Sequence, residues 1–527
     1  MPEVRLAAAY LVPHAFEGAG SRPPRQIPPD NARAHDNLGV RLAESGKTEL
    51  AVPEFEKAVA LCEDFALGHF HLALAYDRLG RVSQAAGEYE AALRIDPDLV
   101  DARYALSAIC WKLGDREGAI KLLRQIAPRD PAFAAEVRYN LGVELRQVGR
   151  LEEATRQLLA ALQSQPQSVP SHIALAQVYT ERRDFTAAVA TLRQAIRRAP
   201  GCAECHYDLG EALRLKGDLG AAEDELRAAL RIDLRYPRAH RQLGLVLRQK
   251  GDYRAAVAEL RQAVAQEAQD SEGHYYLGSA LLKLGERDLA IDELTLAAQL
   301  DPYDSGTHVT LAQALRQAGK GDEAAEQTKQ AQALDELKAN AGRSRVLLGA
   351  AVEHLDRGDV DTALRELRES TALSPDYPDA QYQLARAMLR KDAADRETAS
   401  VLRRAIALKP DHAQAHLELG LLLQRLGDAR EGLQQVRRAA EMAPSLAEAR
   451  RALGRDALGT GDWPAAVREF GAILVFNPDD RDARQNLSLA LARQHGKTVP
   501  TSGAPHTWKR AIDQPDAFFH GKELVAA

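Results

Sequence analysis

Residues 239–266 read AHRQLGLVLRQKGDYRAAVAELRQAVAQ. In the first half, Leu243, Val246 and Leu247 have the three- and four-residue spacing that places apolar side chains on one face of a helix. The second half repeats this spacing at Ala256, Leu260, Ala263 and Val264. The stretch therefore predicts two amphipathic helices in succession.

The two predicted helices are separated by a turn at Gly251 and Asp252. Glycine readily adopts the left-handed conformation that ends a helix, and an aspartate side chain can cap the free amides at the start of the next one. We therefore expect a helical hairpin. One hairpin cannot bury two apolar faces alone, so neighbouring hairpins are required.

The chain supplies such neighbours at a period of about 34 residues. A leucine (alanine at residue 350) followed by a small residue recurs at Leu38-Gly39, Leu72-Ala73, Leu106-Ser107, Leu141-Gly142, Leu175-Ala176, Leu209-Gly210, Leu243-Gly244, Leu277-Gly278, Leu311-Ala312, Ala350-Ala351, Leu384-Ala385, Leu419-Gly420 and Leu453-Gly454. We call the first residue of each pair the reference leucine. Prolines that stop the second helix follow at Pro97, Pro131, Pro166, Pro200, Pro302, Pro375, Pro410, Pro444 and Pro478.

This unit resembles the tetratricopeptide repeat, a helix-turn-helix of 34 residues. The aromatic position of the repeat's second helix is kept as Phe55, Tyr89 and Phe470 and changes elsewhere. The resemblance implies an all-α fold, a right-handed α-solenoid of about thirteen hairpins with a C-terminal capping helix. It also implies an inner groove, lined mainly by the first helices, that binds other proteins.

The repeat register divides the chain into five segments. Near Leu334 the second helix of the ninth unit continues and the register slips by five residues, which predicts an internal boundary. The segments are an extended lead-in (1–30), a repeat block of about nine units (31–343), a second block of about four units (344–480), a capping helix (481–495) and a flexible tail (496–527). The tail carries Trp508, Phe518 and Phe519.

Composition narrows the classes of partner and compartment. The chain has 527 residues, 45% of them hydrophobic, and a net charge of -6, which gives no general attraction to nucleic acid or to anionic membranes. No run approaches the roughly 20 apolar residues that cross a bilayer. We expect a cytoplasmic protein, and the short apolar run from Leu6 to Val12 leaves an exported form open.

The sequence Cys202-Ala-Glu-Cys205-His206 matches the C-x-x-C-H pattern of covalent c-type haem attachment. The repeat register offers another explanation, because a histidine three residues before the reference leucine recurs at His35, His69, His172, His206, His240, His274, His308 and His416. Cys205 likewise occupies a small-residue position, and only Cys202 is unexplained by register. We expect no cofactor, and keep a haem site and a redox-active or zinc-binding cysteine pair as alternatives.

The histidine series does not predict a metal chain. Zinc needs ligand nitrogens at about 2.0–2.1 Å, whereas equivalent positions on neighbouring hairpins are separated by a helix packing distance of about 8–10 Å. We expect these imidazoles to pack between the first and second helices.

Two rows of side chains are predicted to face the inner groove. Tyrosines two residues before the reference leucine are Tyr104, Tyr139, Tyr207, Tyr275 and Tyr382, and arginines five residues after it are Arg146, Arg214, Arg248 and Arg316. Both residue types are frequent at binding hot spots. The alternative is structural, because tyrosine also packs at this position and a cation is favoured at a helix C-terminus.

The sequence therefore predicts a non-catalytic interaction scaffold that binds an extended or helical segment of another protein. We expect that segment to carry acidic and aromatic side chains. The pattern contains no phosphate loop, nucleophile elbow or H-E-x-x-H motif, and we expect no enzyme activity. The alternatives are a c-type haem protein and an RNA-binding repeat protein; acids at Glu136, Glu204, Glu211 and Glu272 oppose RNA binding.

Overall fold

The computed structural model describes residues 29–126, 134–391 and 395–494, which form 26 helices and no strand. The first helices of the hairpins are α2 (Asp30–Glu44), α4 (Ala66–Arg78), α6 (Val100–Leu113), α8 (Ala134–Gln147), α10 (Val169–Glu181), α12 (Ala203–Lys216), α14 (Pro237–Lys250), α16 (Ser271–Leu284), α18 (Ser305–Gln317), α21 (Pro378–Arg390), α23 (Ala413–Arg425) and α25 (Ala447–Thr460). The second helices are α3 (Thr48–Leu61), α5 (Val82–Ile95), α7 (Arg116–Ile126), α9 (Leu151–Ser164), α11 (Phe185–Arg198), α13 (Leu219–Ile232), α15 (Tyr253–Gln266), α17 (Arg287–Leu300), α20 (Val360–Leu373), α22 (Arg396–Leu408), α24 (Ala429–Met442) and α26 (Trp463–Phe476). The remaining two are α19 (Gly321–Asp356) and α27 (Arg481–Gln494).

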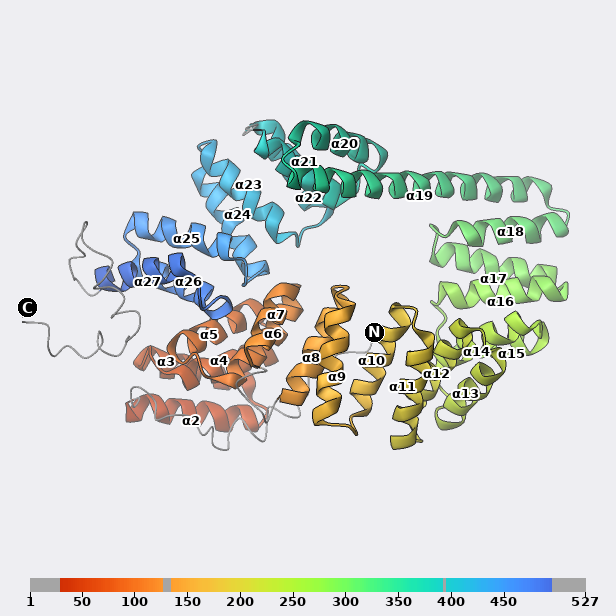
Figure 1. Cartoon of the computed structure of the whole chain (residues 1–527), viewed down its shortest axis with the longest axis horizontal. Helices are drawn as coiled ribbons and strands as arrows, with labels where there is room; N and C mark the ends of the chain where they lie inside the picture. Colours follow the sequence, from red (N-terminus) through yellow and green to blue (C-terminus); the bar gives the residue numbers. More distant parts are fainter. Residues whose placement is uncertain (1–28, 127–133, 392–394, 495–527) are drawn as a thin grey trace, which may run out of the picture. The chain divides into compact units, whose positions relative to one another are not determined.

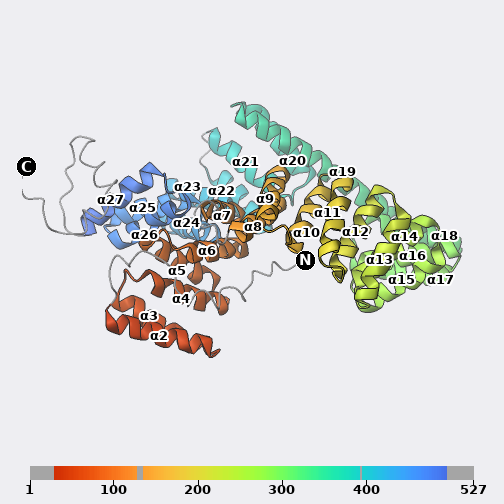
Figure 2. The ribbon, with the colours of Figure 1, turned by 60° about the horizontal axis from the view of Figure 1, so that its bottom comes forward.

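Successive helices pair as hairpins, and these follow one another along the chain (Figure 1). The second helix of a hairpin packs on the first helix of the next, as α15 does on α16 and α17 on α18. Figure 2 shows the same run of neighbours, α14 to α18, from another direction. The prediction of an all-α fold built from tandem hairpins is confirmed.

The turn between α14 and α15 has the predicted chemistry. Gly251 has φ 85°, a left-handed conformation, and its amide donates to the carbonyl oxygen of Arg248 at 3.1 Å. The Asp252 carboxylate then accepts a hydrogen bond from the amide of Ala255 at 3.1 Å. This glycine and aspartate therefore end one helix and begin the next.

The small residue after the reference leucine permits close helix contact within each hairpin. A Cβ atom placed on Gly244 would lie 2.6 Å from Leu260 Cγ on the facing helix. Equivalent pairs, at 2.6 to 2.7 Å, are Gly142 with Leu158, Gly210 with Leu226 and Gly278 with Leu294. The aromatic position is buried wherever it is kept, at Phe55, Tyr89 and Phe470.

Seven of the eight repeated histidines contact the second helix of their hairpin, as predicted, whereas His172 Nδ1 lies 2.8 Å from the carbonyl oxygen of Ser168. His240 Nδ1 lies 2.7 Å from Glu259 Oε2 on α15, and its Nε2 lies 3.2 Å from the carbonyl oxygen of Leu234. The same bond to a residue 19 positions later occurs in the pairs His35–Glu54, His69–Glu88, His206–Glu225, His274–Glu293, His308–Gln327 and His416–Gln435. We did not predict the acceptor at this spacing from the sequence.

Helix α19 crosses the predicted boundary between residues 343 and 344 without a break. Its 36 residues serve as the second helix of one hairpin, with α18, and as the first helix of the next, with α20. The stretch has no proline and only two internal glycines, Gly342 and Gly349, so little in it interrupts a helix. The division into two repeat blocks stays a prediction.

Contacts divide the chain into two compact units, residues 1–446 and 447–527. In the described part of the second unit, α27 packs on α26 around buried Phe470 and Ala483. Helix α27 covers the residues for which a capping helix was predicted. The lead-in before residue 29 and the tail with Trp508, Phe518 and Phe519 lie outside the described residues.

Across residues 29–126, 134–391 and 395–494, the structure holds no helix with the length and hydropathy needed to cross a membrane.

Candidate functional site

Consecutive first helices lie against one another, as well as against their hairpin partners. These contacts join α8 with α10, α10 with α12, α12 with α14 and α14 with α16. The described second helices make no comparable contacts with each other. The side chains that meet between first helices therefore form one surface, which we call the first-helix face. Its residues are Tyr104, Glu136, Asn140, Arg146, Gln177, Glu181, Asp208, Glu211, Gln242, Arg248, Tyr276 and Ser279.

Polar side chains connect neighbouring first helices at a fixed spacing of 31 residues. The Gln177 amide donates to Asp208 Oδ2 at 3.4 Å, and the Gln242 amide donates to Glu211 Oε1 at 3.3 Å. In each pair one residue lies two positions after a reference leucine, and the other lies one position before the reference leucine of the next hairpin. The sequence contains this pattern, but single-helix periodicity does not reveal it.

The predicted tyrosine row is only partly on this face. The Tyr104 hydroxyl donates to Glu136 Oε1 at 2.9 Å and accepts from the Asn140 amide at 2.5 Å, so it joins α6 to α8. Tyr139 is half-buried on α8, and burial raises its pKa above the ordinary value. Both side chains remain partly accessible.

Tyr207 is a packing residue in the structure. Its side chain is only 3% exposed, its ring lies 5.2 Å from the ring of Tyr236, and the Arg238 guanidinium lies 5.2 Å from its centroid. This burial corrects the prediction that Tyr207 offers open contact area to a partner.

The last two tyrosines of the row are half-buried. Tyr275 packs edge-on against Tyr276 at 5.2 Å, and Tyr382 lies 4.4 Å from the ring of His412. Part of each side chain remains accessible.

The four predicted arginines have different surroundings. Arg146 donates to Glu181 Oε1 at 2.8 Å, and Arg248 lies over the Tyr276 ring at 5.3 Å from its centroid. Arg214 is half-buried, and the exposed Arg316 donates to the Thr328 hydroxyl at 3.1 Å. The Nε atoms of Arg146, Arg214 and Arg248 are buried without a hydrogen-bond partner.

Helix α12 presents an acidic stripe, defined as Glu204, Asp208 and Glu211, with the spacing of one helical face. Burial and the neighbouring Glu204 carboxylate raise the pKa of Asp208 to about 7, against the hydrogen bond from Gln177. Asp208 is therefore partly protonated near neutral pH. The first-helix face carries both signs of charge; Glu136 and Glu211 are among the acids noted in the sequence, and Asp208 is not.

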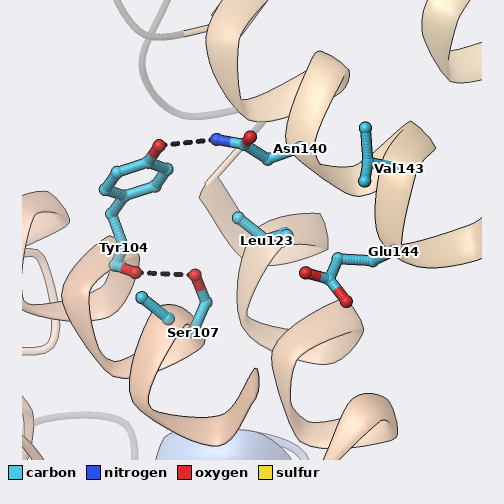
Figure 3. A pocket seen from close by; sticks show the side chains of 7 residues that line it. Tyr104, Ser107, Leu123, Asn140, Val143 and Glu144 are labelled. Atoms are coloured by element: carbon cyan, nitrogen blue, oxygen red, sulfur yellow. Dashed lines mark hydrogen bonds between the residues drawn. The ribbon is translucent and has the colours of Figure 1, made fainter. Parts of the chain in front are cut away.

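A small pocket lies beside Tyr104, between α6, α7 and α8 (Figure 3). Glu144 lines it, is 7% exposed, and has one carboxyl oxygen, Oε2, that accepts no hydrogen bond. Burial raises the pKa of Glu144 to about 8, and the positive charge of Arg116 opposes that shift only in part. We did not predict this residue, because its position in the repeat, three residues after a reference leucine, is normally a packing position.

Cys202 and Cys205 form a disulfide at the start of α12. Cys202 is the N-cap residue, and its sulfur accepts from the amide of Cys205, which is fully buried. His206 Nδ1 lies 2.6 Å from Glu225 Oε2 and its Nε2 lies 3.2 Å from the carbonyl oxygen of Pro200. The equivalent pair of contacts occurs at His69, His240, His274, His308 and His416.

The described residues contain no group of three or more histidine, cysteine, aspartate or glutamate side chains placed to hold a metal ion.

Comparisons with protein families match nearly the whole array. The profile of the Cilia and flagella-associated protein 70 C-terminal domain matches residues 116–346. Two profiles of the tetratricopeptide repeat match residues 78–141 and residues 37–100, 348–399, 396–447 and 451–497. No curated protein matches the chain.

Solved structures with similar folds include YrrB, described as a tetratricopeptide protein with an unusual peptide-binding site. YrrB is 20% identical to this chain with a TM-score of 0.31, and the match covers 34% of this chain and 91% of the YrrB chain. PilF of Pseudomonas aeruginosa is 23% identical with a TM-score of 0.34, and the match covers 37% of this chain and 88% of the PilF chain. A chain of the Cut9–Hcn1 assembly is 15% identical with a TM-score of 0.33, and the match covers 88% of this chain and 97% of that one. None of these similarities bears on function.

Proposed function

Because the chain belongs to the tetratricopeptide repeat family, we propose that it is a non-catalytic scaffold that holds a segment of a partner protein on its first-helix face. The observation that supports this most directly is the series of cross-helix contacts from α6 to α16. These contacts hold aromatic and charged side chains at equivalent positions on consecutive helices. An extended or helical segment laid across the helices would meet them in turn.

The partner segment carries acidic and aromatic side chains. Arg214 and Arg248 are half-buried, which strengthens their electrostatic interaction with a bound acid relative to fully exposed arginines. The half-buried rings of Tyr139 and Tyr275 supply rigid apolar area for aromatic anchors. The acidic stripe on α12 adds a region that favours positive charge at one place along the segment.

The haem alternative is opposed by the contacts of the C-x-x-C-H motif. Thioether attachment needs two reduced thiols, so the disulfide between these cysteines would have to be reduced first. Iron ligation needs a free ring nitrogen, and both nitrogens of His206 have protein partners. The disulfide is consistent with the alternative of a redox-active cysteine pair, and the absence of a cofactor stays a prediction.

The RNA alternative is opposed by the charge of the same face. A single-strand binding surface needs a groove with a positive path for the phosphates. The carboxylates of Glu136, Asp208 and Glu211 each make cross-helix contacts on the first-helix face, so they lie where phosphates would pass.

Site-specific photo-crosslinking in the native cell tests the proposal. A photoreactive residue is placed at Arg214 on α12, three residues after Glu211 of the first-helix face, and in a matched variant at Leu289, a 44% exposed residue of α17 on the second-helix side. We expect a discrete crosslinked protein, identified by mass spectrometry, from position 214 and not from 289. Crosslinking at 289 alone, or equally at both, would place the partner elsewhere.

A further inference from the structure

We propose that the pocket around Glu144 binds the ammonium group of a lysine side chain from the partner segment. This inference rests on the proposed function, because the pocket adjoins Tyr104 and Asn140 of the first-helix face. It names one side chain that the partner must present. Nothing in the repeat pattern itself requires an acidic pocket at this point.

The pocket exists because one position of the repeat holds a small residue. Ala108 lies two positions after its reference leucine and lines the pocket. Later hairpins have larger or polar side chains at this position, namely Val143, Gln177, Glu211, Leu245 and Ser279. The missing volume leaves about 10 Å³ in which the centre of a water-sized group can lie. A lysine ammonium group fits such a space, whereas a guanidinium group is larger.

The polar atoms that line the pocket suit a donor. Glu144 is more than nine-tenths buried, its carboxyl group points toward Leu123 and Ser107 (Figure 3), and its Oε2 has no hydrogen-bond donor. The Ser107 hydroxyl donates to the Tyr104 carbonyl at 2.6 Å, so its own oxygen can still accept. An ammonium group carries three donors and no acceptor, which matches these two oxygens.

The apolar atoms suit the rest of a lysine side chain. Leu123 from α7 and Val143 from α8 form the walls, and the Tyr104 ring lies at one side (Figure 3). A lysine stem packs its methylene groups along apolar surface while the charged end reaches a polar site. A single bound water would satisfy Glu144 but would make no use of these walls.

Binding an ammonium group should release a proton. The free Glu144 has a pKa of about 8 because it is buried, so at pH 7 most molecules carry it protonated. A bound cation favours the carboxylate, and affinity should therefore rise as pH increases from 6 to 8 and then level off. The other charged or titratable groups nearby are Arg116, Glu136 and Tyr104, and burial keeps the pKa of Tyr104 well above this range.

Methyl NMR on the full-length protein, labelled at leucine and valine methyl groups, tests the pocket directly, because Leu123 and Val143 report from its walls. The probes are n-butylammonium, n-butylguanidinium and n-butanol, which share a four-carbon stem. We expect saturable shifts of these two residues with n-butylammonium and none of comparable size with the other two. Equal shifts with n-butanol, or no saturable shift, as for a site that holds only water, would overturn the proposal.

Three variants and one peptide complete the test. Glu144→Gln should weaken n-butylammonium binding at least about tenfold, and Ala108→Leu, which fills the opening, should abolish it. Glu152→Gln on α9, an exposed glutamate, is the matched control and should bind like the parent. A capped Ala-Lys-Ala peptide should compete with n-butylammonium; failure to compete would overturn the assignment to a protein lysine.

The two proposals can fail separately. Crosslinking at Arg214 with no amine binding at Glu144 would leave the scaffold function and remove the lysine assignment. Amine binding in the pocket with crosslinks only at Leu289 would remove the scaffold surface on which the lysine assignment depends.

Discussion

At the scale of single residues, the array depends on contacts that leave no space for an added atom. Gly244 and the Leu260 side chain meet where α14 crosses α15, and both are buried. The sequence indicated this, because each of the thirteen reference positions is followed by glycine, alanine or serine. The bond between His240 and Glu259 could not be predicted in the same way, since nothing in helical periodicity links residues 19 apart on two helices.

Gly244→Ala should destabilise its hairpin by about 1–3 kcal/mol, because the new Cβ would lie 2.6 Å from Leu260 Cγ and the helices would have to separate. Hydrogen exchange measured by mass spectrometry should show faster exchange in α14 and α15 and little change two hairpins away. Gly349→Ala is the control: this exposed glycine within α19 has no neighbour within 4 Å, and alanine should stabilise the helix by about 0.5–1 kcal/mol. Equal effects at both sites would contradict the close-contact explanation.

The cysteine pair gives a second residue-scale prediction. Without reductant, iodoacetamide should modify the partly exposed Cys62, spare the buried Cys110, and leave Cys202 and Cys205 unmodified because they are bonded to each other. After mild reduction, Cys202 should react before the buried Cys205. Peptide mass spectrometry should identify which cysteines are modified without reductant and which are modified after mild reduction.

Protein made with an active haem-attachment pathway should show no pyridine haemochrome spectrum. A signal that disappears in Cys202→Ala would revive the haem alternative.

At the scale of elements, α19 is the point where the repeat pattern and the structure differ most. The register slip near Leu334 predicted a boundary, and the helix instead continues to Asp356 because its sequence has strong helix formers and no proline. A slip in register therefore does not imply a break in the chain. Lys338 of this helix donates to the Ser305 hydroxyl of α18 at 2.9 Å, so its first half belongs to the preceding hairpin.

A fragment of residues 29–340 should therefore remain a folded helical array, because it keeps the contacts of α19 with α18 through Lys338. Circular dichroism should show helix content in proportion to its length. A fragment ending at residue 325 removes most of that covering helix, and hydrogen exchange in α18 should then rise sharply. Loss of most helix in the longer fragment would contradict the near-neighbour character of the array.

At the scale of the whole molecule, the sequence predicts the fold far better than the site. Periodicity at Leu243 and its equivalents specifies which faces are buried, and Gly251 and Asp252 specify where helices end. Contacts between first helices, such as Gln177 with Asp208, depend on the packing of one hairpin on the next. The burial of Tyr207 and the space beside Ala108 depend on the same packing, and no property of one helix determines them.

The proposed function predicts that the effect of removing arginines depends on where they lie as well as on how many are removed. A variant with Arg146, Arg214, Arg248 and Arg316 changed to alanine should bind the captured partner more weakly, and its affinity should depend less on salt, because fewer positive charges on the first helices attract acidic side chains. Helix content by circular dichroism should be unchanged. We expect the largest single contribution from Arg214 or Arg248, since Arg146 already pairs with Glu181.

The matched control changes four exposed arginines of second helices, namely Arg193, Arg227, Arg261 and Arg287. Both variants lose the same positive charge, so any effect of net charge is common to them. Dissociation constants measured at low and at physiological salt should separate them, with the control close to the parent. A first-helix variant that binds as tightly as this control at both salt concentrations would move the binding surface away from the first-helix face.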